Sequence, residues 1–105
     1  CGAQLSGKAV PTMEDSEKTI PELKARIAKS IDFLKTIKAS EVAGQEGRDL
    51  SVKMGANEMK FKAQNFLQWF SIPNFMFHAT TAYNIMRQGG VELAKRDFLG
   101  KNPEA

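Results

Sequence analysis

The feature that most constrains this chain is the run of residues 72–88, which predicts an α-helix with apolar side chains on nearly every side. Its apolar residues fall on three stripes: Phe75, Ala82 and Ile85 on the first, Met76, Ala79, Tyr83 and Met86 on the second, and Phe77 on the third. A helix that is apolar nearly all round must be buried nearly all round. The fold therefore has to cover this helix on several sides.

The helical pattern begins near residue 64 and continues to about residue 88, where Gly89 and Gly90 form a glycine C-terminus. Pro73 lies inside the pattern. It lacks a backbone donor and disfavours the α conformation at Ile72, so we expect a kink or a fresh helix start at this point. The sequence thus predicts a kinked helix over residues 64–88.

A second amphipathic helix is predicted over residues 20–38. Thr19 can cap it, Pro21 suits its first turn, and Glu22 completes a capping box. Apolar residues follow at spacings of three and four: Leu23, Ile27, Ile31, Leu34 and Ile37. The acidic run just before the helix, Glu14, Asp15 and Glu17, is interpreted as complementing the positive end of the helix dipole, with an acid/base pair as the alternative.

Between the two helices, alternating apolar and polar residues predict a short β-hairpin over residues 49–62, with its turn at residues 55–57. Its predicted inward face is Leu50, Val52, Met59 and Phe61. Residues 1–18 are expected to be irregular, and residues 39–47 to form a polar loop. Residues 95–100 are interpreted as an apolar anchor that folds the C-terminal tail onto the helices.

Composition sets broad limits on the class of protein. The 105 residues allow one compact domain, and no apolar run reaches the length of a membrane-spanning helix. The net charge is +3 and its charges are dispersed, which argues against nucleic-acid binding. The single cysteine, Cys1, excludes an internal disulfide and favours a reducing, cytoplasmic location.

The predicted helices cannot bury the apolar residues that they carry. One helix, a hairpin and a short N-terminal segment are too few to surround the helix at residues 72–88. We therefore expect the cover to come either from additional chain or from a second copy. A truncated four-helix bundle is favoured over an obligate dimer, because such bundles need four helices around the core. The predicted fold class is mainly α, with one domain over residues 1–105 that is a partial bundle.

The last third of the chain carries a family resemblance. Residues 73–83, PNFMFHATTAY, followed by Ile85, Arg87, Gly90 and Val91 and by KRDFLG at residues 95–100, resemble the C-terminal signature of the domain-of-unknown-function family nineteen-ninety-three. The earlier motif of that family resembles Pro11, Glu14-Asp15, Glu17, Glu22-Leu23 and Arg26-Ile27. The family itself resembles the DinB/YfiT-like four-helix bundles, many of which are metal-dependent enzymes. By this resemblance, the chain lacks the first helix and most of the second.

The same resemblance raises the question of a metal site. In the metal-binding relatives, two histidines at i and i+4 on the last helix join a third from the second helix. Asn74 and His78 occupy the two positions on the last helix. Asn is a weak ligand for zinc or nickel, and His78 is the only histidine of the chain. Three interpretations of His78 stay open: a core residue, a member of a polar pocket without metal, and a metal ligand.

The candidate pocket residues are Asn74, His78, Thr81 and Tyr83, with no catalytic residue assigned. Arg87 and Lys95 are candidates for anion binding, although cations near a helix C-terminus also complement its dipole. The function predicted is an uncharacterised helical-bundle protein with a degenerate metal-type pocket, which binds a small ligand or a partner without catalysis. No cofactor is expected, and a divalent metal ion is the one alternative considered.

Two alternatives from other classes remain. The first is a divalent-metal-dependent enzyme of the DinB-like, thiol-transferase type, whose further ligands lie outside this chain. The second is a structural dimerisation module that uses the exposed apolar faces. A homodimer and an unidentified small molecule are the partners considered, and neither nucleic acid nor a membrane is expected.

Overall fold

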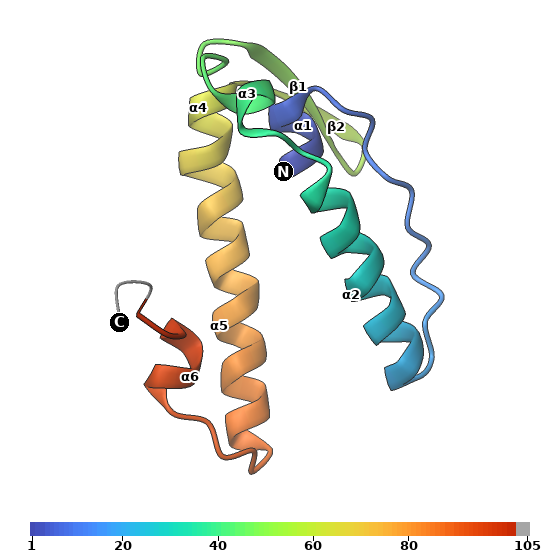
Figure 1. The fold of residues 1–105 in the computed structure, drawn as a ribbon, viewed down its shortest axis with the longest axis vertical. Coiled ribbons are helices and arrows are strands. Elements are labelled where there is room, and N and C mark those ends of the chain that lie inside the picture. Colours follow the sequence, from blue (N-terminus) through green and yellow to red (C-terminus); the bar gives the residue numbers. More distant parts are fainter. Residues whose placement is uncertain (103–105) are drawn as a thin grey trace.

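The computed structural model describes residues 1–102 and shows a mostly helical chain with one two-stranded antiparallel hairpin (Figure 1). The helices are α1 (Gly2–Ser6), α2 (Ile20–Lys35), α3 (Ala39–Val42), α4 (Ala63–Asn65), the π-helix η1 (Phe66–Ser71), α5 (Ile72–Gln88) and α6 (Lys95–Leu99). The strands are β1 (Asp49–Met54) and β2 (Asn57–Lys62). The predicted mainly helical fold with a hairpin is confirmed at this level.

The hairpin pairs in the register expected from its alternation, with Leu50 opposite Phe61 and Val52 opposite Met59. Leu50 and Val52 are buried and Phe61 is half-buried, as predicted. Met59 is exposed, so its placement in the inward face was wrong. It shares a face with Phe61 but lies nearer the turn.

The small core gathers where the two ends of the hairpin meet α1 and the start of the long helix. Its buried members come from four elements: Leu5, Leu50, Val52, Ala63 and Phe66. The ring of Phe66 stacks on Phe70 with centroids 5.6 Å apart, and Phe61 contacts both rings. The core therefore joins α1, the hairpin and η1, and leaves most of α2 and α5 outside it.

The prediction that residues 1–18 are irregular throughout is wrong. Residues 2–6 form α1, which contributes the buried Ala3 and Leu5. The guanidinium of Arg48 donates hydrogen bonds to the carbonyl oxygens of Gln4 and Leu5 at 2.6 and 2.7 Å. Carbonyls in the last turn of a helix lack a regular i+4 partner. Arg48, which precedes β1, supplies donors to both of them, and the carbonyl of Gln4 also accepts from the N–H of Gly7 at 3.4 Å.

The capping box predicted for α2 is confirmed. The Oγ1 of Thr19 accepts from the backbone N–H of Glu22, and the Glu22 carboxylate accepts from the N–H groups of Thr19 and Lys18. The helix ends at Lys35, three residues before the predicted residue 38, because the N–H of Thr36 turns back to the carbonyl of Phe33. The supposed polar loop that follows contains the single turn α3.

Pro73 interrupts the α geometry without turning the chain. Residues 66–71 form the π-helix η1, and α5 starts afresh at Ile72 with Pro73 in its first turn. Ile72 keeps helical angles, so α4, η1 and α5 continue along one axis (Figure 1). A proline ring collides with the carbonyl four residues earlier in a regular α-helix. The wider π turn displaces that carbonyl, which explains why a helix continues through this position.

The helix α5 ends at the predicted pair of glycines. Gly90 has a φ of +89°, a left-handed conformation that favours glycine, and the N–H of Val91 returns to the carbonyl of Met86. The chain then reverses, and α6 lies beside the C-terminal half of α5 (Figure 1).

The helices α2 and α5 are not covered by the described residues. Figure 1 shows them as two separated helices that extend away from the hairpin end, and neither has a buried residue. On α5, Phe75, Phe77 and Ile85 are each about two-thirds exposed (69, 65 and 67%). The Cα radius of gyration is 16.3 Å, whereas a compact domain of this length has about 13 Å. The expectation that these elements cannot bury their own apolar residues is confirmed.

Candidate functional site

The polar candidates Asn74, His78 and Thr81 share one face of α5. At 3.6 residues per turn, Asn74 lies about 40° and Thr81 about 60° from His78 around the helix axis, both on the same side of it. All three side chains are exposed. The imidazole of His78 meets the ring of Phe77 edge to face, with centroids 5.3 Å apart. The face is therefore a polar stripe that lies among the exposed apolar side chains of Phe75, Phe77 and Ile85.

Thr81 has its hydroxyl committed to the backbone. Its Oγ1 donates to the carbonyl oxygen of Phe77 at 2.7 Å, the back-bonding that threonine often makes within a helix. This leaves Asn74 and His78 as the polar groups of the stripe that remain free to contact a ligand.

Tyr83 does not join this stripe. It lies about 140° from His78 around α5, since the two are five residues apart. Its half-buried ring instead meets Phe98 of α6, with centroids 5.6 Å apart and planes at 77°. The structure thus brings together three of the four candidate pocket residues and assigns Tyr83 to the contact between α5 and α6. The helical period of the sequence would have been enough to predict that Tyr83 lies on a different face from His78.

The donor set for a metal ion is small. Within residues 1–102, no three His, Cys, Asp or Glu side chains lie close enough to hold one ion. Asn74 and His78 offer one amide oxygen and one imidazole, whereas zinc sites use three or four protein ligands. These residues therefore do not fit a complete metal site, and His78 as a ligand stays a prediction that needs donors from elsewhere.

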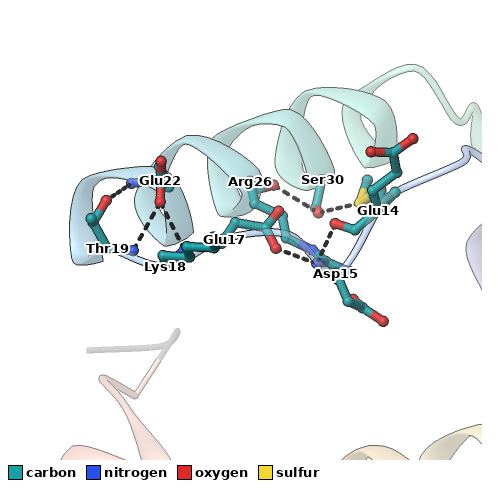
Figure 2. Close-up of polar contacts among 9 residues, drawn as sticks. Glu14, Asp15, Glu17, Lys18, Thr19, Glu22, Arg26 and Ser30 are labelled. Atoms are coloured by element: carbon teal, nitrogen blue, oxygen red, sulfur yellow. Dashed lines mark hydrogen bonds and ion pairs between the residues drawn. The ribbon is translucent and has the colours of Figure 1, made fainter.

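A different polar cluster, centred on Arg26 of α2, is built more completely (Figure 2). The Nη1 of Arg26 lies 2.7 Å from the carboxylate of Glu17 and 2.8 Å from that of Asp15, and it donates to the carbonyl oxygen of Glu14 at 3.1 Å. The acidic run thus acts as a partner of one arginine. The interpretation of these acids as helix-dipole partners missed this contact, because Arg26 lies two turns inside the helix.

Hydrogen bonds lower the pKa values of two carboxylates near the start of α2. The pKa of Glu17 is lowered, first by a hydrogen bond from its own backbone N–H and then by the one from Arg26. The pKa of Glu22 is lowered by the N–H of Lys18 and by Thr19. Both groups are held in the charged form, so the cluster fastens the extended segment before α2 to the helix and shows no sign of a poised proton donor.

Two hollows accompany these elements. A groove of about 550 Å³ runs between the extended segment and α2, and includes Glu17, Arg26 and Lys29. A hollow of about 500 Å³ lies between α1, α3 and the start of the long helix, with an apolar floor that includes Leu5 and Val42. Sequence reasoning missed the second hollow, since α1 and α3 were not expected.

No described helix is long and apolar enough to cross a membrane.

Comparison with known proteins places these features in a family context. The chain matches the family described as Domain of unknown function (DUF1993) over residues 1–99. It is also similar to the crystal structure of a DinB family member protein from Shewanella denitrificans, with a TM-score of 0.80 and 33% sequence identity over 97% of this chain. The chain spans 58% of the length of that protein. No curated protein matches the chain significantly.

Proposed function

The chain belongs to the DUF1993 family of domains of unknown function, and from this premise we propose that it is part of a helical-bundle protein that binds a small ligand or a partner without catalysing a reaction. The binding face is the polar stripe of α5, defined by Asn74, His78 and Thr81. The observation that carries the proposal is the pairing of one imidazole with one amide inside an apolar surface. Such a surface holds a ligand by apolar contact and orients it with a few polar groups.

The stripe becomes a pocket when α2 and α5 are covered. The exposed apolar residues of both helices support a four-helix bundle of DinB type, in which two further helices lie against them. The similar DinB family member supports the same arrangement, because 58% of its length corresponds to this chain and the remainder has no counterpart here. The cover that we propose is therefore additional helical chain, and His78 then lies at the boundary between that cover and α5.

The polar groups of the stripe favour binding over metal-dependent catalysis. An amide at position 74 is a poor donor for zinc or nickel, and the Thr81 hydroxyl is already bonded to Phe77. One exposed imidazole retains a donor and an acceptor for a ligand.

Metal content tests the proposal directly. The protein is purified under mild conditions as the wild type, as His78→Ala and as the polar control His78→Gln, and divalent ions are measured by mass spectrometry. We expect far less than one ion per chain in all three. One ion per chain that disappears in His78→Ala would show a metal site and overturn the proposal.

The binding part is tested by ligand-observed NMR with a set of small amides, carboxylates and aromatic alcohols. We expect some of these compounds to bind the wild type. His78→Ala should abolish their binding, and the distant Lys24→Ala should leave it unchanged. A set of compounds that shows the same contacts with both variants would exclude the α5 stripe as the binding face.

The metal-dependent enzyme remains the second candidate, and the DinB-like fold is what favours it. Titration with Zn²⁺ and reduced glutathione separates the two, since a thiol transferase would bind both and a non-catalytic stripe would bind no Zn²⁺.

The alternative of a dimerisation module is tested by light scattering. A monomer rules it out, and a dimer that Phe75→Asp dissociates supports it.

A further inference from the structure

The groove between α5 and α6 collects positive charge and hydrogen-bonding groups that the proposed function does not use. It has a volume of about 270 Å³ and is lined from α5 by Thr80, Tyr83, Asn84 and Arg87, and from α6 by Lys95 and Phe98. The four α5 residues follow the i, i+3, i+4, i+7 spacing of one helix face. These four residues lie about 120–180° around α5 from His78, so the groove is separate from the polar stripe.

The two cations of the groove have no acidic partner. Within residues 1–102, neither Arg87 nor Lys95 takes part in an ion pair. The nearby carboxylate of Asp97 accepts from the N–H of Ala94 and is not among the groove residues. Two like charges that face one small groove repel each other, and an anion between them removes that repulsion.

The helix dipole explains only one of these cations. Arg87 lies in the last turn of α5, where a positive charge is favourable. Lys95 is the first residue of α6, where the dipole favours a negative charge instead. Its position is therefore better explained by the groove that it shares with Arg87 than by the helix to which it belongs.

The remaining groups define the rest of the ligand. The Thr80 hydroxyl and the Asn84 amide add neutral hydrogen-bonding groups beside the cations. The edge-to-face pair of Tyr83 and Phe98 provides an aromatic wall. We propose that the α5–α6 groove is a binding site for a small oxyanion, a phosphate or a carboxylate, attached to an aromatic or apolar group. Arg87 and Lys95 bind the oxyanion, and the ring of Phe98 packs against the apolar group.

The test is a titration of the protein, followed by the backbone amide resonances of residues 80–98, with phenyl phosphate, inorganic phosphate and benzoate. We expect saturable shifts with phenyl phosphate or benzoate, and the tighter of the two identifies the anionic group. Inorganic phosphate should bind more weakly than phenyl phosphate, because it lacks the ring. Equal binding of the two phosphates would overturn the role of the aromatic wall, and no saturable shift with any probe would overturn the site.

Matched variants decide whether the contact is specific. Arg87→Gln and Lys95→Gln should each raise the Kd about tenfold or more, as expected for the loss of a charge-assisted hydrogen bond. Arg96→Gln removes the same charge from the neighbouring position of α6, which does not line the groove, and should change the Kd less than about twofold. An equal loss in Arg96→Gln would show attraction by net charge alone and exclude the site. All three positions are exposed, so the fold, checked by circular dichroism, should persist. Metal content and the His78 variants do not enter this test, so its outcome is independent of the proposed function.

Discussion

The rings of Tyr83 and Phe98 meet edge to face across the space between α5 and α6, with centroids 5.6 Å apart and planes at 77°. Both side chains are half-buried, whereas the neighbouring Leu99 is 67% exposed. This aromatic pair is therefore the contact that fixes the short C-terminal helix, which has too few residues to be stable on its own.

Phe98→Ala should release α6 from α5. The loss of the half-buried ring and its aromatic contact should cost about 1–2 kcal/mol of local stability. The measurement is limited trypsin digestion, since the backbone after the exposed Lys95 and Arg96 is cleaved faster when α6 detaches and unfolds. Leu99→Ala is the matched control on the same helix and should leave the digestion rate unchanged. Equal digestion of wild type and Phe98→Ala would contradict this role for the ring.

Phe66→Ala should be the most damaging single truncation in the π-helix. Its ring is 2% exposed and contacts Phe61 and Phe70, so its removal should lower the free energy of unfolding by about 3–5 kcal/mol. Trp69 lies in the same π-helix but is 78% exposed, and Trp69→Ala should cost less than about 0.5 kcal/mol. Urea unfolding followed by circular dichroism measures both. A larger loss for Trp69→Ala would show that other parts of the protein bury this residue.

Acid should loosen the extended segment before α2. Glu17 and Glu22 have pKa values below the ordinary 4.5, so their contribution to stability is complete above pH 4.5 and disappears as the pH falls through the lowered values. Hydrogen exchange of residues 14–24 at a series of pH values measures the effect. Glu17→Gln should loosen the segment at pH 7 and reduce its further change in acid.

The control for this prediction is Glu14→Gln. Arg26 bonds to the backbone carbonyl of Glu14 and not to its carboxylate, so this substitution should leave the exchange rates near those of the wild type. If Glu14→Gln and Glu17→Gln behaved alike, general surface charge would explain the acid effect better than the Arg26 cluster.

Thr19→Ala should destabilise the start of α2 by about 1 kcal/mol, because it removes the hydroxyl that accepts a hydrogen bond from the backbone N–H of Glu22. The helix has no buried residue in the described part of the chain, so its first turn depends on this local contact. Amide exchange of residues 20–24 measures the loss. Lys24→Ala, on the exposed surface of the same helix, should slow or leave unchanged this exchange, and faster exchange there would point to an unrecognised contact of Lys24.

Local patterns in the sequence were enough to predict much of the fold. The capping residues Thr19 and Glu22, the alternation around Leu50 and the final Gly90 each act through neighbours only a few positions away. The helix α1 could not be predicted in this way, because the group that completes it, Arg48, lies more than forty residues along the chain. The π-helix likewise reflects how the chain accommodates Pro73.

In the candidate site, too, features set by local sequence could be predicted, and features set by contacts between segments could not. The helical period of α5 places Asn74, His78 and Thr81 on one face and Tyr83 on another, although all four are predicted pocket residues. Membership of the family, inferred from residues 73–83 and 95–100, is confirmed by the match over residues 1–99. The contacts of Arg26 with Asp15 and Glu17, and the groove that Arg87 and Lys95 line, depend on how neighbouring segments turn back along a helix, which the helical period does not predict.

The hydrogen bonds from Arg48 to Gln4 and Leu5 join the first turn of the chain to the residue before β1. The docked position of α1 therefore depends on a contact between residues more than forty positions apart, and its loss would report that this contact has broken. Cys1, the chain's single and solvent-facing thiol, immediately precedes this turn. A fluorophore attached there would report whether α1 is docked, without altering any residue of the core.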